Sequence, residues 1–199
     1  MQFLLSDSFA AMFCQVLPLS LLAGVVYLIA RRAALKKQNS SFRLSAELLR
    51  ALFVCYLTGL ISLTLVPANF WSSFWYLLLT GHPTGEQFSF FSGDFNLNSA
   101  LLGILTGKLT AGSWVISMLA GNFLMLVPMG VFLPLVFPRL RGRRILPLAL
   151  LLPLILELLQ PVVGRSFDVD DLLLNALGLL TGWALVFLLH KCKKDFSRG

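Results

Sequence analysis

The sequence predicts an all-α protein: a polytopic integral membrane helix bundle of about five transmembrane helices, with an interfacial or re-entrant element in one long loop. Hydrophobic residues make up 57% of the 199 residues and charged residues only 13%, whereas soluble domains carry about a quarter charged residues. The mean hydropathy is +0.83. Five separate runs also approach the about 20 apolar residues that cross a bilayer. We therefore expect a single membrane domain over residues 1–199.

The five apolar runs are expected to form the membrane-spanning helices. The fourth run is the shortest, and Val162 and Val163 extend it. The first run has no basic residue before it and a basic cluster after it, which is the reverse of a cleaved signal peptide. We therefore interpret it as a retained helix. The runs cover residues 9–30, 48–66, 113–137, 145–161 and 172–190.

One long loop, residues 67–112, separates the second span from the third. It begins with an aromatic cluster that includes Trp71, Trp75 and Tyr76, and such residues favour the membrane–water interface. Residues 98–109 are apolar but too short to span, and they contain Gly103 and Gly107. We expect interfacial helices in this loop and an interfacial or re-entrant element at 98–109. The alternative, a sixth span, would move the basic C-terminal tail away from the side of the other basic loops.

The distribution of charge predicts the orientation in a bacterial cytoplasmic membrane. The formal net charge is +7, and basic residues of membrane proteins gather on the cytoplasmic side. With five spans, three segments that fall on one side hold thirteen of the sixteen basic residues. We expect the N-terminus and the 67–112 loop outside, the C-terminus in the cytoplasm, and no nucleic-acid partner. The thirteen residues are Arg31, Arg32, Lys36, Lys37, Arg43, Arg139, Arg141, Arg143, Arg144, Lys191, Lys193, Lys194 and Arg198.

Polar residues near the outer ends of the last three spans form the candidate site. Glu157 and Gln160 are three residues apart and therefore share one face of a helix. Glu157 lies about 18 Å from the start of its span at 1.5 Å per residue, which is the outer half. An ionisable residue inside a span is usually paired or functional. The predicted ligand-binding residues are Asn122, Glu157, Gln160, Arg165, Asp168, Asp171 and Asn175.

A purely structural role for the same residues is the competing interpretation. The amides would then supply hydrogen bonds between helices, and Glu157 would pair with Arg165. Asp170 and Asp171 would form the N-terminal cap of the fifth span. Gly178 and Gly182 have the spacing of small residues that let helices approach closely, and Pro128 is one of four prolines expected to kink the third and fourth spans.

The order and spacing of these residues resemble the VanZ-like family. The resemblance covers residues 48–190 and is most specific in the C-terminal half. The family takes its name from an accessory protein of glycopeptide resistance, linked to tolerance of teicoplanin, a lipid-tailed drug. The resemblance implies functional or packing roles for Asn122, Pro128, Gly130, Glu157, Gln160, Arg165, Asp168, Asp171, Asn175 and Gly178.

Three classes of function fit these observations. In the first, the polar pocket binds a lipid-linked wall precursor or the lipid-tailed antibiotic, and Arg165 contacts a phosphate or carboxylate. In the second, the protein is a metal-assisted hydrolase or transferase acting on membrane lipid. We assign no cofactor or metal, but the ligands of a divalent ion would be Glu157, Asp168, Asp170 and Asp171. In the third, the protein is a small transporter that works as a homo-oligomer.

Overall fold

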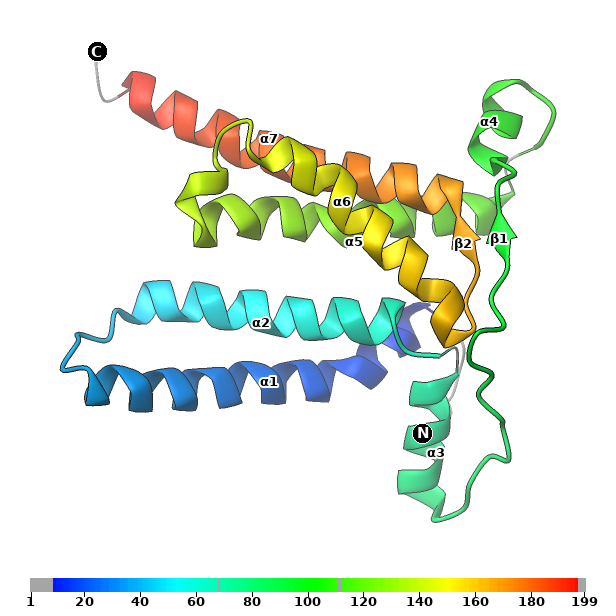
Figure 1. The fold of residues 1–199 in the computed structure, drawn as a ribbon, viewed down its shortest axis with the longest axis horizontal. Helices are drawn as coiled ribbons and strands as arrows, with labels where there is room; N and C mark the ends of the chain where they lie inside the picture. The colour runs from blue at the N-terminus through cyan, green and yellow to red at the C-terminus, as the bar shows by residue number, and fades with distance from the viewer. Residues whose placement is uncertain (1–8, 68, 111, 197–199) are drawn as a thin grey trace. The chain divides into compact units, whose positions relative to one another are not determined.

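The computed structural model describes residues 9–67, 69–110 and 112–196 (Figure 1). Arg198, counted above in the basic tail, lies outside the described residues. The chain divides into two compact units, one ending at Phe90 and the other beginning at Phe91. Each unit is built almost entirely of helices, which confirms the all-α class.

The first unit contains α1 (Phe9–Lys37), α2 (Leu44–Thr64) and α3 (Phe70–Thr80). The helices α1 and α2 form an antiparallel hairpin through a short turn at 38–43 (Figure 1). The aromatic cluster of the long loop forms α3, which is tied to the other two helices by its indoles. Trp75 donates from Nε1 to the carbonyl of Gln15 at 2.9 Å, and Trp71 donates to that of Ser62 at 3.0 Å.

The second unit holds three long helices and the connections between them. These are α5 (Ser113–Val136), α6 (Ile145–Leu159) and α7 (Val169–Phe196). The pair α5 and α7 has the most extensive contact in the molecule, and α6 also packs against α7. The shorter elements are β1 (Phe95–Asn96), α4 (Ala100–Leu105), η2 (Pro138–Leu140), η3 (Gln160–Val163) and β2 (Phe167–Asp168).

Glycines allow α5 and α7 to pack with their backbones in close approach. A Cβ atom at Gly178 would overlap the carbonyl oxygen of Phe123, and one at Gly182 would overlap that of Val127. From the other helix, a Cβ at Gly130 would overlap the carbonyl oxygen of Leu179. Because backbone atoms cannot move aside like flexible side chains, each of these positions needs a residue without a side chain.

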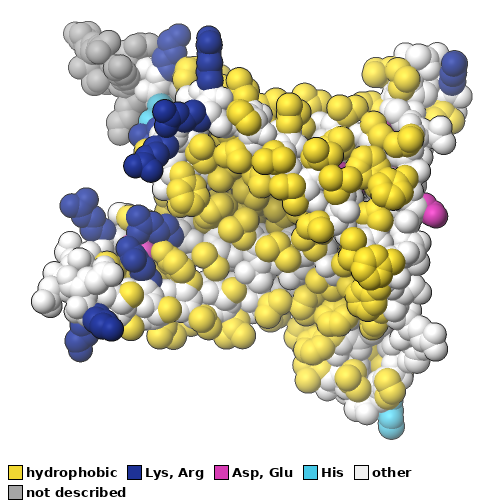
Figure 2. All heavy atoms as spheres, in the orientation of Figure 1, with side chains coloured by type: hydrophobic (Ala, Val, Ile, Leu, Met, Phe, Trp, Pro, Cys, Tyr) yellow, Lys and Arg dark blue, Asp and Glu magenta, His cyan; other side chains and the backbone are white. Residues whose placement is uncertain are grey.

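Within the described residues, five helices are long and apolar enough to cross a membrane, and the protein is a multi-pass membrane protein. Large hydrophobic side chains are exposed along these helices, and they cover much of the visible helical surface in Figure 2. Lys and Arg gather in each unit where two spans are joined, between α1 and α2 and between α5 and α6 (Figure 2). The spans are Ala11–Lys37, Leu44–Thr64, Val115–Val136, Ile145–Val163 and Val169–Cys192.

The first and the last long helix extend beyond the apolar runs that predicted them. The first was expected to end at residue 30 and continues to Lys37, and the last begins at Val169 rather than at 172. Charged residues can continue a helix once it has left the hydrocarbon, so hydropathy underestimates its length. Within 98–109, only Ala100–Leu105 is helical, and Gly107 follows with a left-handed φ of 70°.

Candidate functional site

The candidate site lies in the second unit, where α6 ends and α7 begins. The two helices are joined by η3 and a short segment in which Gly164 adopts a left-handed φ of 76°. The backbone N–H of Arg165 donates to the carbonyl of Gln160 at 3.0 Å and closes this turn. The tight connection makes α6 and α7 neighbours, so that polar residues on the last turn of α6 face those on the first turns of α7.

Glu157 is at the centre of the site. Its residue is fully buried, and each of its carboxylate oxygens accepts hydrogen bonds. Oε1 accepts from the amides of Gln160 at 3.1 Å and Asn175 at 3.4 Å. Oε2 accepts from the backbone N–H of Asp168 at 3.3 Å. The carboxylate therefore links α6, the connection and α7, and a buried charge without such donors would be strongly destabilising.

Asn175 presents a buried acceptor that has no partner. The residue is 1% exposed, and its Oδ1 has no hydrogen-bond partner among the described residues. The amide orientation follows from Glu157, because the carboxylate requires the Nδ2 donor on its side. An unpaired buried oxygen of this kind costs about 1–3 kcal/mol, and a donor from a bound molecule would recover that cost.

Asp171 and Asn122 connect α7 to α5 beside this centre. The Asn122 amide donates from Nδ2 to Oδ1 of Asp171. The guanidinium of Arg165 lies within electrostatic reach of both Asp171 and Glu157. Burial lowers the pKa of Arg165 from its usual range, and the two carboxylates oppose that shift. An arginine starts from so high a pKa that it keeps its charge, so the site contains a half-buried cation.

Asp168 forms the N-terminal cap of α7. Its Oδ1 accepts from the backbone N–H of Asp170 at 2.8 Å, which is the geometry of a capping carboxylate. Its Oδ2 accepts from the Asn96 amide at 2.8 Å. The alternative in which Asp170 and Asp171 cap this helix is therefore wrong. The helix starts at Val169, three residues earlier than its apolar run, and the cap moves with it.

Asp170 caps a different helix, α4. It is 1% exposed, and its Oδ1 accepts from the hydroxyl of Ser99 while Oδ2 accepts from the backbone N–H of Leu101 at 3.0 Å. Ser99 in turn accepts from the N–H of Leu102 at 2.9 Å. The first turn of α4 is thus fixed to the first turn of α7, and Asp170 is not part of the group around Glu157.

The sequence did not predict that a segment of the long loop, around Gly93 and Asn96, packs against the connection between α6 and α7. The strand β1 pairs in parallel with β2, with Phe95 opposite Phe167 and Asn96 opposite Asp168. Gly93 packs so closely that a Cβ there would overlap the carbonyl oxygen of Arg165. The pairing is only two residues long, so no periodic pattern in the sequence predicts it.

The four carboxylates considered as metal ligands do not form one group. Within 9–67, 69–110 and 112–196, no set of three or more His, Cys, Asp or Glu side chains is arranged to hold a metal ion. Glu157, Asp168, Asp170 and Asp171 instead accept hydrogen bonds from amides, a hydroxyl and backbone N–H groups. The arrangement suits a ligand that offers hydrogen-bond donors and an anionic group.

Comparison with known families gives one match. The VanZ/LLP1 family profile matches residues 21–190, which includes the 48–190 region of the predicted resemblance and part of α1. Neither curated proteins nor solved structures include a match to the chain.

Proposed function

The chain belongs to the VanZ/LLP1 family, and from this premise and the geometry around Glu157 we propose that it binds the polar head of a lipid-linked or lipid-tailed ligand. One observation carries the proposal: the buried Oδ1 of Asn175, which has no hydrogen-bond partner among the residues that the structure describes. The Asn175 amide contacts the Glu157 carboxylate, which lies within electrostatic reach of the Arg165 guanidinium, in a helix bundle with many exposed apolar side chains.

The site chemistry selects the ligand class. An amine, hydroxyl or amide N–H would donate to Asn175 Oδ1, while a phosphate or carboxylate would pair with Arg165. The acyl or prenyl tail would lie along exposed apolar side chains such as Leu173 and Leu177 of α7. A lipid-linked wall precursor and a teicoplanin-type antibiotic both have this construction. We propose that binding one of them gives the protein a role in tolerance of the cell envelope to such drugs.

The proposal includes an orientation in the bacterial cytoplasmic membrane. The basic segments 31–43 and 139–144 would face the cytoplasm by the positive-inside rule. The Glu157 end of α6, at the opposite end of that helix from 139–144, would then face outward. A wall precursor or an antibiotic would be met on that outer face.

The test is a binding measurement on the full chain with teicoplanin as the probe. The chain, purified and placed in lipid nanodiscs, should bind teicoplanin, and Asn175→Ala should weaken binding about tenfold or more, as expected for a buried hydrogen bond. Asn98→Ala, which makes the same change at an exposed position, is the matched control and should bind normally.

A second probe separates the ligand class from the particular ligand. A glycopeptide without a lipid tail should bind much more weakly, since the apolar surface contributes only when a tail is present. Equal binding of teicoplanin by the chain and by Asn175→Ala, at equal abundance, would contradict the proposed site. A further outcome is that teicoplanin fails to bind while a prenyl-linked wall precursor binds with the same dependence on Asn175. That result would contradict the antibiotic as the ligand but support the proposed site.

A further inference from the structure

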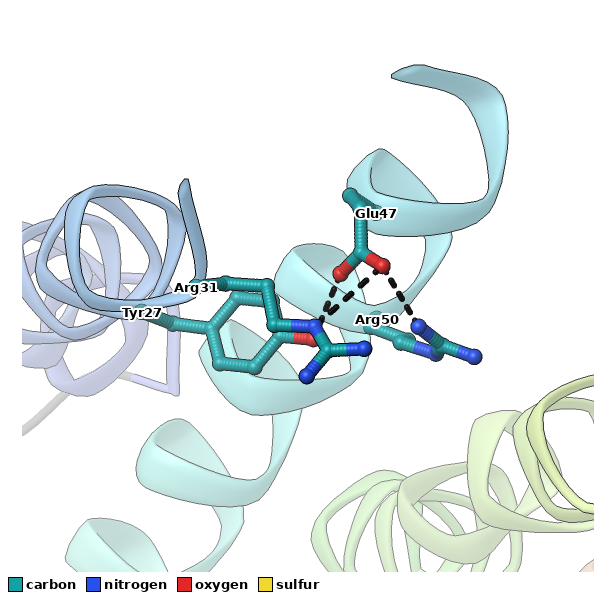
Figure 3. Close-up of polar contacts among 4 residues, drawn as sticks. All are labelled: Tyr27, Arg31, Glu47 and Arg50. Atoms are coloured by element: carbon teal, nitrogen blue, oxygen red, sulfur yellow. Dashed lines mark hydrogen bonds and ion pairs between the residues drawn. The ribbon is translucent and has the colours of Figure 1, made fainter. Parts of the chain in front are cut away.

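A second buried carboxylate, Glu47, organises a basic cluster in the first unit, far in sequence from the residues around Glu157. Glu47 lies in the first turn of α2 and is 3% exposed. The phenol of Tyr27 donates to its Oε2 at 2.9 Å. Arg31 Nε and Arg50 Nη1 both reach Oε1, at 3.4 and 2.6 Å (Figure 3). The carboxylate thus holds two guanidinium groups next to each other.

The cluster of Glu47, Arg31 and Arg50 carries a net positive charge. A single carboxylate faces two arginines, and each guanidinium has five N–H donors but bonds Glu47 through one nitrogen. The remaining nitrogens of both side chains point away from the carboxylate in Figure 3. The side chains of Arg31 and Arg50 are 35% and 40% exposed, so these donors are accessible to a ligand while Glu47 is not.

The position of the cluster along its helices matches the phosphate layer of a membrane. The helix α1 has 29 residues, or about 44 Å at 1.5 Å per residue, whereas the hydrocarbon core is about 30 Å thick. Arg31 stands six residues, about 9 Å, before the end of α1, and Arg50 stands equally far from the start of α2. Tyr27 lies one turn deeper, at the depth that interfacial aromatic residues favour.

We propose that Arg31 and Arg50, held side by side by Glu47, bind the phosphate of an anionic phospholipid. Arginine forks match phosphate oxygens geometrically, and a phosphate between the two groups would compensate the excess charge. Tyr27 and Glu47 act as positioning residues that keep both guanidinium groups oriented before the lipid arrives. The site does not depend on the function proposed for the Glu157 group or on which leaflet the cluster faces.

The experiment compares two variants that remove the same charge. The purified full chain in mild detergent is titrated with phosphatidylglycerol or with phosphatidylcholine, and bound lipid is counted by native mass spectrometry. Arg31→Gln with Arg50→Gln removes the cluster, and Arg32→Gln with Arg43→Gln removes two exposed charges from the same hairpin. Both variants lose two positive charges, so any general attraction between the basic hairpin and an anionic lipid falls equally in both.

The cluster variant should lose at least tenfold more phosphatidylglycerol affinity than its control, with phosphatidylcholine binding unchanged in both. Equal losses in the two variants would overturn the proposal. If the cluster variant does not fold, Arg50→Gln against Arg43→Gln serves instead, since Arg31 still neutralises Glu47. Soluble glycerol phosphate, at the same concentration as phosphatidylglycerol, should not displace the bound lipid. Full displacement would show that the cluster binds free phosphate esters and would overturn the lipid assignment.

Discussion

At the scale of single residues, both oxygens of the buried Glu157 carboxylate accept hydrogen bonds. Glutamine has the same shape but would direct an NH₂ group at one of those donors. We expect Glu157→Gln to lower the free energy of unfolding by about 1–3 kcal/mol, measured by denaturation in detergent. The control is Glu86→Gln, at an exposed position, which should change stability by less than about 0.5 kcal/mol. A neutral Glu157→Gln would contradict the double-acceptor arrangement.

The pair Asn96 and Asp168 allows a test by exchange. Asp168→Asn keeps an oxygen to cap α7, since asparagine caps nearly as well, but it sets two amide donors against each other across β1 and β2. We expect a loss of about 1–2 kcal/mol in stability. Adding Asn96→Asp restores a donor and an acceptor, so the double variant should recover most of the loss in the same melting experiment. A double variant no more stable than Asp168→Asn would show that the contact contributes nothing.

The sequence singles out polar residues that interrupt apolar spans, but it does not give most of their hydrogen-bond partners. Glu157, Asn122 and Asn175 stand out because they interrupt apolar runs, where an unneeded polar group is costly. Asn96 and Ser99 lie in a polar loop about 70 residues from their partners, and nothing in this spacing predicts the two contacts. The structural alternative took Asp170 and Asp171 as the cap of α7, because the apolar run begins three residues after the helix does. The capping residue precedes the first helical residue, Val169, and is therefore Asp168.

At the scale of elements, all five spans could be predicted, because a run of about 20 apolar residues is typical of a membrane-spanning helix. Their ends could not, because α1 continues through Arg31 and Lys36 once outside the apolar region. The hairpin of α1 and α2 brings Arg31 and Arg50 onto one carboxylate. Glu47 and Arg50 are only three residues apart on α2, whereas Tyr27 and Arg31 come from the other helix.

The crossing of α5 and α7 is set by glycines, and it can be tested with single methyl groups. Gly178→Ala and Gly182→Ala would each place a Cβ on a backbone carbonyl of α5. We expect each to cost about 2–3 kcal/mol or to prevent folding, as overpacking does. Gly59→Ala is the matched control, because its Cβ would meet only the movable Ser20 hydroxyl at 3.3 Å. The measurement is the melting temperature of each variant in detergent. An unchanged melting temperature for Gly178→Ala would mean that α5 and α7 can move apart at little cost.

The short helix α4 should depend on its connection to α7. Six residues cannot hold a helix in isolation, and Asp170 supplies acceptors to Ser99 and to the N–H of Leu101. We expect Asp170→Ala to speed hydrogen exchange at Leu101 and Leu102 by about tenfold or more, since it removes both contacts. Asp94→Ala, an exposed aspartate in the same loop, should leave these amides unchanged. Equal protection in the two variants would argue that α4 is held by other contacts.

At the scale of the whole molecule, five spans would place the two ends of the chain on opposite sides of the membrane. The apolar runs give the number of spans but not which side of the membrane each loop faces. The orientation is therefore predicted from the basic residues alone. The segments 31–43 and 139–144 hold nine of them. The same argument decides whether the Glu157 group faces the cell exterior, where the ligand proposed above would be met.

Reporter fusions test this orientation. A reporter that is active only in the cytoplasm should be active when fused after Gly199 or inserted in 139–144, since these segments carry the excess of basic residues. The same reporter should be inactive at the N-terminus and in the 81–94 segment, and a periplasmic reporter should give the inverse pattern. Removing the charges of Arg139, Arg141, Arg143 and Arg144 together should weaken the bias, because short-loop arginines set orientation. Equal activity at both termini would contradict five spans, while a fully inverted pattern would keep the five spans and place the Glu157 group in the cytoplasmic half, away from any ligand on the outer face.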